Sequence, residues 1–196
     1  MSEYKANSNT QITQHFNSKE FVCKCGQNHN IKINDSLCLK LEELYSYLKC
    51  SKIIISSGFR CPAHSIKVGG YATDEHTKGN AADIICYDKN NKIIDTRTVC
   101  CAAQEIDFSG IGRIDYSAVH VDVSASRKWY GDELTGYVSQ SIPHMDFMII
   151  LGFKNHIAKK SKSPLKLTIT STVDYLKKRG DKMPCGSRKP KPRKPR

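Results

Sequence analysis

The chain lacks any run of about 18 apolar residues, so its sequence predicts no transmembrane helix. Residues 1–8 contain no apolar stretch and therefore predict no Sec signal peptide. We accordingly expect synthesis in the cytoplasm, with release only through lysis or a dedicated export route. The sequence also shows no internal repeat and no phosphate-binding glycine loop, which argues against a repeat protein and a P-loop nucleotide hydrolase.

Acidic residues are scarce beyond residue 151. Residues 152–196 contain 15 Lys and Arg but only 2 Asp and Glu, whereas residues 1–151 contain 16 and 17. The formal net charge of +12 therefore belongs to the C-terminal part of the chain. Such a basic tail binds a polyanion, such as nucleic acid, anionic lipid or an anionic wall polymer, or it is a solvated segment without a dedicated partner.

The length of 196 residues suits one domain with an appendage. We predict a disordered N-terminus over residues 1–13 and one domain over residues 14–131. Residues 132–175 form an extension of undefined structure, and residues 176–196 form a basic disordered tail. Within the extension, an apolar segment at residues 142–151 is too short to span a membrane.

Hydrophobic periodicity predicts helices at residues 35–49 and 96–106. The first has a stripe of Leu37, Leu41, Leu44 and Leu48. Strands are predicted at residues 52–56, 83–87, 110–114 and 118–123, and residues 61–80 read as a long loop. Together these elements predict an α+β fold, with a small, mostly antiparallel sheet and flanking helices.

Nine cysteines are present, and without a signal peptide they do not predict disulfides. Most are expected to be small buried hydrophobes. Cys23-Lys24-Cys25-Gly26 resembles one half of a metal site, but no second pair matches it, so we expect no structural zinc at these cysteines.

Three other residues, His76, Asp83 and His120, are candidate metal ligands. Two imidazoles and one carboxylate suit Zn²⁺, and three protein ligands leave a coordination position for water. In residues 118–123, period-two alternation places His120 and Asp122 on the same face. A His and an Asp seven residues apart are common by chance, so this spacing alone does not establish a site.

Several blocks in a fixed order add specificity. They are ISSGFRCPAH at residues 55–64, VGG at 68–70, HTKGNAADI at 76–84, GIGR at 110–113 and VHVD at 119–122, followed by Arg127 and Trp129. Over roughly residues 14–130 the chain thereby resembles the zinc D-Ala-D-Ala carboxypeptidase family. That family includes D-Ala-D-Ala dipeptidases and phage endolysins that cut L-Ala-D-Glu bonds, and it shares its fold with the signalling domain of hedgehog proteins.

The resemblance implies that His76, Asp83 and His120 bind Zn²⁺. It also implies that Arg60 binds a substrate carboxylate or stabilises an oxyanion, as a guanidinium does well. Asp74 occupies a position where the family usually has a substrate-binding serine, so Asp74 is the second residue expected to bind substrate.

The general base is the second departure from the family. Many members have a carboxylate three residues before the last zinc histidine, where this chain has Ser117. Asp122 and Asp115 are the candidate replacements. Asp122 alternatively supports a ligand imidazole, which is the role we favour.

These observations predict a monomeric zinc peptidase that hydrolyses peptidoglycan stem peptides, at a D-Ala-D-Ala or an L-Ala-D-Glu bond, in the setting of phage or prophage lysis. The alternative is a non-catalytic, zinc-containing module that binds cell wall or forms part of a virion. A third hypothesis makes the basic tail the main functional element, with nucleic acid as its partner.

Overall fold

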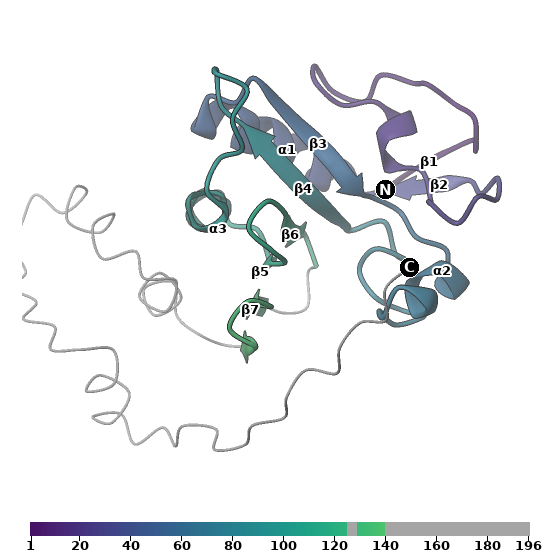
Figure 1. Ribbon diagram of the computed structural model, residues 1–196. Coiled ribbons are helices and arrows are strands. Elements are labelled where there is room, and N and C mark those ends of the chain that lie inside the picture. Colours follow the sequence, from purple (N-terminus) through teal and green to yellow (C-terminus); the bar gives the residue numbers. More distant parts are fainter. Residues whose placement is uncertain (125–128, 140–196) are drawn as a thin grey trace, which may run out of the picture. The chain divides into compact units, whose positions relative to one another are not determined.

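A computed structural model describes residues 1–124 and 129–139 of the protein (Figure 1). The predicted leucine stripe forms helix α1, Asp35–Leu48. Asn34 caps this helix because its side chain accepts a hydrogen bond from the Ser36 amide, and Lys49 ends it in the left-handed conformation. The buried face of α1 consists of Leu37, Cys38, Leu41 and Leu44. Helix α1 therefore forms one wall of the hydrophobic core.

The main sheet has six strands in the order β3-β4-β6-β5-β7-β8. Its strands are β3 (Lys52–Ser57), β4 (Ala81–Tyr87), β5 (Gly110–Arg113), β6 (Val119–Asp122), β7 (Trp129–Asp132) and β8 (Tyr137–Ser139). Strands β5 and β7 pair in parallel, and the other neighbouring strands are antiparallel. The fold class is therefore α+β, as predicted; the hedgehog-like fold stays a prediction.

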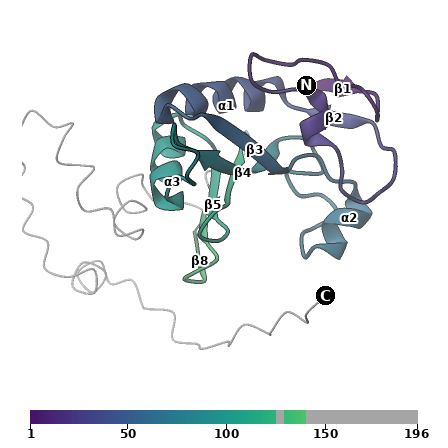
Figure 2. The ribbon, with the colours of Figure 1, turned by 45° about the horizontal axis from the view of Figure 1, so that its top comes forward.

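Helix α3, Thr96–Glu105, packs against β5 and β6 and also contacts α1 (Figure 2). Its apolar side chains Val99, Ala102 and Ala103, together with Ile106 directly after it, are all at most 5% exposed. In β6, Val119 and Val121 are buried, which leaves His120 and Asp122 on the opposite face. Alternation along β6 thus places the valines in the core and the candidate site residues His120 and Asp122 on the other face.

The prediction of a disordered N-terminus is corrected by the structure. Strand β1, Ser2–Tyr4, pairs in antiparallel fashion with β2, Ile31–Ile33. The hydropathy of β1 does not predict it, because its partner β2 supplies the apolar side chains and β1 contributes backbone hydrogen bonds. Met1 adds an ion pair between its amino group and Asp35, at 2.9 Å.

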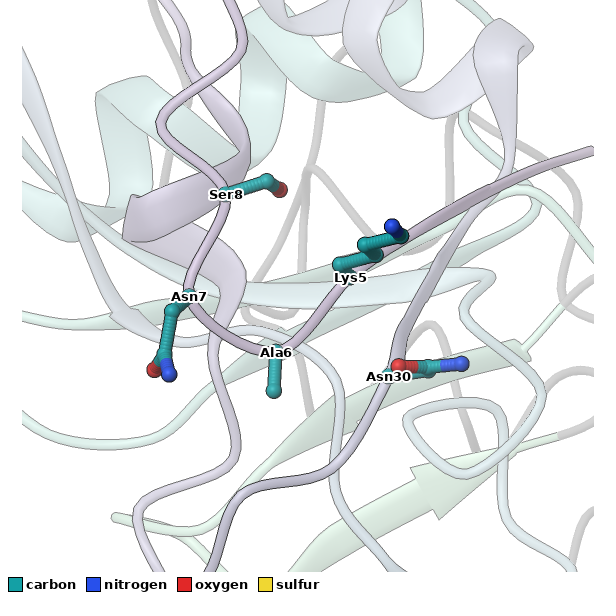
Figure 3. Close-up of a pocket in the computed structure, with 5 residues that line it drawn as sticks. All are labelled: Lys5, Ala6, Asn7, Ser8 and Asn30. Carbon is teal, nitrogen blue, oxygen red and sulfur yellow. The ribbon is translucent and has the colours of Figure 1, made fainter.

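A surface pocket lies beside β1 and is lined by Lys5, Ala6, Asn7, Ser8 and Asn30 (Figure 3). These five residues include no histidine, thiol or carboxylate. This pocket therefore offers no group that could ligate zinc or accept a proton from water.

Two further predictions differ from the structure. Residues 61–80 include a short helix, α2, at Pro62–Lys67, where the proline stands at the first helical position that tolerates it. The sheet also continues past residue 131 into β7 and β8, so the predicted domain boundary falls within β7. A buried ion pair between Arg113 and Asp132, at 2.5 Å, joins β5 to β7.

The chain divides into two units, Met1–Phe147 and Met148–Arg196. Arg127, the apolar segment at residues 142–151 and the basic tail at residues 176–196 lie outside the described residues. Among the described residues, none of the helices has the length and apolar character needed to cross a membrane.

Candidate metal centre

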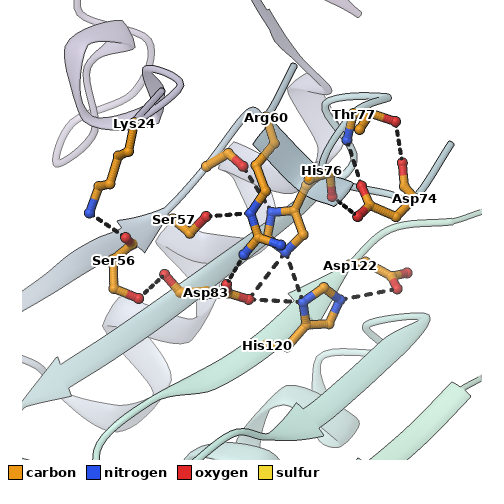
Figure 4. A network of polar contacts seen from close by, with 12 residues as sticks. Lys24, Ser56, Ser57, Arg60, Asp74, His76, Thr77, Asp83, His120 and Asp122 are labelled. Carbon is orange, nitrogen blue, oxygen red and sulfur yellow. Dashed lines mark hydrogen bonds and ion pairs between the residues drawn. The ribbon is translucent and has the colours of Figure 1, made fainter. Parts of the chain in front are cut away.

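Three predicted ligands meet beside the paired central strands β4 and β6 (Figure 4). Asp83 on β4 and His120 on β6 are directly paired across the sheet, and His76 lies in the turn before β4. Asp83 Oδ1 is 2.9 Å from His120 Nδ1 and 3.2 Å from His76 Nε2, and the two ring nitrogens are 3.2 Å apart. Tetrahedral zinc separates nitrogen and oxygen ligands by about 3.3 Å. The three atoms therefore fit one zinc ion.

His76 is buried and held in one orientation. Its Nδ1 donates a hydrogen bond to the carbonyl of Gly58, at 2.8 Å, so Nε2 is the nitrogen left for a metal. A Cβ added at Gly58 would lie 2.6 Å from the Cα of Phe21, so only glycine allows the two backbones to approach this closely. Gly58 thereby places the carbonyl that orients His76.

His120 lies between two carboxylates. Its Nδ1 faces Asp83, and its Nε2 is 3.6 Å from Asp122 Oδ2. Asp122 is itself fixed, because its Oδ1 accepts a hydrogen bond from the Ser124 amide at 2.9 Å. Asp122 thus contacts Nε2 and leaves Nδ1 directed at Asp83 and His76; its support of a metal-bound imidazole stays a prediction.

The charges of these groups depend on one another. Burial alone would raise the pKa of Asp83, but hydrogen bonds with His120 and His76 hold that pKa well below its usual range. Burial alone would lower the pKa of His120, but its hydrogen bonds to Asp122 and Asp83 raise it to about 9. At neutral pH the metal-free site therefore holds a carboxylate beside an imidazolium, and a divalent cation has to compete with the imidazolium proton.

Arg60 reaches the site from the end of β3, where the ladder is irregular between Ile55 and Ser57. Its Nη2 contacts Asp83 Oδ2 at 2.5 Å, and its Nε donates to the Ser57 hydroxyl at 2.8 Å. Asp83 thus turns one oxygen to the histidines and the other to Arg60. The structure places the guanidinium next to a predicted ligand; its role in substrate binding stays a prediction.

The other two predicted carboxylates stabilise turns. Asp74 accepts hydrogen bonds from the Thr77 amide, at 3.0 Å, and from the Ser65 hydroxyl, and so shapes the turn before His76. Asp115 is exposed between β5 and β6, where its Oδ1 accepts three hydrogen bonds from Ser117 and Ala118. Of the two predicted bases, Asp122 contacts a ligand imidazole and Asp115 closes a turn. The roles of Asp74 and Asp115 stay predictions.

Sequence reasoning missed a second group of metal-ligating side chains. Cys23, Cys25, His29 and Cys61 have ligand atoms within 4.8 Å of one another. The sequence indicated the first two as half of a site, but the third and fourth ligands do not form the matching pair that a common zinc motif would show. The other described cysteines, Cys38, Cys50, Cys86, Cys100 and Cys101, are buried, as predicted.

Comparison with curated proteins gives no match. A family model described as Peptidase M15 matches residues 14–122, which is more than half of the chain. The matched region contains His76, Asp83 and His120. The chain therefore belongs to the M15 peptidase family, whose members are metallopeptidases that usually depend on zinc.

Proposed function

We propose that the protein is a zinc peptidase that hydrolyses peptidoglycan stem peptides, at a D-Ala-D-Ala or an L-Ala-D-Glu bond. The observation that supports this proposal most directly is the convergence of His76, Asp83 and His120 within 3.2 Å in a chain of the M15 family. A site with three protein ligands is typical of catalytic zinc, whereas structural zinc usually has four.

When bound by these three residues, Zn²⁺ supplies Lewis acidity that activates water and polarises a carbonyl. Asp83 offers Oδ1 to the metal and keeps Oδ2 on Arg60. Arg60, held by Ser57 and Asp83, presents a cation beside the site for a peptide carboxylate or for the charge that develops on the scissile carbonyl oxygen. Asp122 positions His120 and, together with Asp115, is a candidate for the proton acceptor.

The substrate lies in the cell wall, and this fits the uneven charge of the chain. The basic residues beyond position 151 would add affinity for anionic wall polymers. In this proposal the enzyme reaches the wall through lysis, as a phage or prophage lysis enzyme does.

The test is digestion of purified peptidoglycan by the zinc-loaded protein, with the released termini identified by mass spectrometry. Free D-Ala with a stem peptide shortened by one residue, or a new N-terminal D-Glu, would identify the bond that is cut. A chelator and His120→Ala should each abolish cleavage. His15→Ala is the matched control, because His15 contacts Glu42 and none of the ligands.

Intact walls despite stoichiometric zinc at His76, Asp83 and His120 would contradict catalysis. That result would favour the alternative, a non-catalytic module that contains zinc and binds cell wall or forms part of a virion. Sedimentation of the protein with insoluble peptidoglycan in the same samples distinguishes a wall-binding module from a protein with no affinity for the wall.

A further inference from the structure

The second ligand group brings together residues from two separate segments. Cys23, Cys25 and His29 follow the short helix η1, Ser18–Phe21, and Cys61 lies directly before α2. One ligand atom from each lies within 4.8 Å of the others. Sulfur and nitrogen ligands of tetrahedral zinc are about 3.4–3.8 Å apart. The four side chains therefore need only a small inward movement to surround one ion.

The donor set defines the kind of ion. Three thiols and one imidazole suit zinc and other thiophilic metals, and they do not suit Mg²⁺ or Ca²⁺, which take oxygen ligands. Four protein ligands fill a tetrahedral shell and leave no position for water or substrate. The group thus differs in kind from the three-ligand site formed by His76, Asp83 and His120.

His29 provides an independent indication of a ligand. Its Nε2 is buried and has no hydrogen-bond partner among the described residues. A buried polar atom without a partner costs about 1–3 kcal/mol, so most such atoms in proteins have one. A metal ion among the neighbouring thiols would give this nitrogen its partner.

The backbone around the cysteines is arranged for sulfur ligands. The Cys61 amide donates to Cys23 Sγ at 3.2 Å, and the Gln27 amide donates to Cys25 Sγ at 3.4 Å. Gly26 lies between Cys25 and Gln27 with a φ of 83°, which permits the tight turn that follows Cys25. Amide hydrogen bonds of this kind orient metal-bound thiolates and compensate their charge.

A surface pocket borders the group and gives an ion a route from solvent. It is lined in part by Cys25, Cys61 and His64. Cys61 directly follows Arg60, whose guanidinium contacts Asp83. A bond from an ion to Cys61 would therefore restrain the main chain next to Arg60.

We propose that Cys23, Cys25, His29 and Cys61 bind a structural zinc ion that fixes the segment carrying Arg60. This ion cross-links residues 23–29 to residue 61. It acts by holding Arg60 in place and takes no part in the reaction itself.

Metal analysis of the reduced full-length protein tests the proposal. The intact chain should contain two zinc ions. Cys25→Ala and His29→Ala should each reduce the count to one, as should His120→Ala at the other site. Cys50→Ala is the matched control and should keep both ions, because Cys50 is a buried cysteine outside the group.

Replacement of zinc by Co²⁺ assigns each ion to its site without an activity assay. Thiolate ligands give Co²⁺ an intense charge-transfer absorption in the near ultraviolet. This band should persist in His120→Ala and disappear in Cys25→Ala. Cys25→His keeps four ligands and should keep the second ion, which separates loss of a ligand from misfolding.

Amide hydrogen exchange tests the structural role. Exchange of residues 58–68 should accelerate in His29→Ala and stay unchanged in Cys50→Ala. The proposed site would be overturned if the intact protein contains only one zinc ion and Cys25→Ala still contains it. It would also be overturned if the charge-transfer band survives Cys25→Ala. Unchanged exchange in a variant that has lost the ion would overturn the restraint of Arg60.

Discussion

Gly110→Ala is the substitution whose effect follows most directly from the geometry of the site. A Cβ at this position would lie 1.9 Å from Asp122 Oδ2 and 2.5 Å from its Cγ. Ordinary contact begins near 3.4 Å, so the carboxylate would have to move by about 1.5 Å. Because Asp122 also accepts the Ser124 amide and faces His120, this movement disturbs both contacts.

Two effects should result. Overpacking of this kind destabilises a domain by about 1–3 kcal/mol. Loss of a carboxylate behind a ligand imidazole weakens metal binding by about 10- to 100-fold, or roughly 1.4–2.8 kcal/mol. We therefore expect Gly110→Ala to lower both the free energy of unfolding of the metal-free protein and its affinity for zinc.

Urea unfolding of the metal-free protein and competition with a chromophoric chelator measure these quantities separately. In an Asp122→Ala background the obstructing carboxylate is absent, so Gly110→Ala should have little further effect on either quantity. Wild-type stability and zinc affinity in the Gly110→Ala variant would refute the reasoning. So would an effect of the same size in both backgrounds.

Three further predictions concern pH, the base and the tail. The pKa of His120 in the metal-free fold is about 9, above its unfolded value of about 6.5, so the stability that His120 contributes is present below about pH 6.5 and is lost as the pH rises through 9. The urea midpoint should therefore be lower at pH 9.5 than at pH 6, and an unchanged midpoint would contradict this. If Asp122 is the general base, Asp122→Asn should keep zinc and reduce turnover by about 100-fold or more. If Asp122 instead supports His120, the zinc affinity of this variant should also fall by about 10- to 100-fold. Asp115→Asn, at the other candidate base, serves as the comparison. Deletion of residues 176–196 should leave zinc content and small-peptide cleavage unchanged and weaken wall binding most at low salt, and equal wall binding across a salt series would show that this segment adds no affinity.

Helix α1 and strand β6 could be predicted because their own side chains are periodic. The leucines of α1 and the alternating residues of β6 bury one face of each element, so hydropathy identifies them. Strand β1 was missed because it is polar and depends on β2 for its apolar contacts. Helix α2 was missed because Pro62 reads as a breaker, although proline is also accepted at the start of a helix.

In the candidate metal centre, too, some features follow from the local sequence and others depend on contacts between distant segments. His76, Asp83 and His120 could be predicted as a candidate ligand group from their residue types and from the order of the motifs, and the structure brings them together. Contacts between distant segments, such as that of Gly110 with Asp122, require the strand pairing to be known. The Cys61 ligand lies far along the chain from Cys23, so spacing alone could not join them.

The pairing of Asp83 with His120 makes the metal centre sensitive to strand alignment. A slip of one residue between β4 and β6 would place a valine opposite Asp83 and turn His120 to the other face of the sheet. The three ligands then meet only in the native register. Zinc present during refolding should accordingly favour the native register over slipped ones, because only the native pairing of β4 with β6 binds the metal.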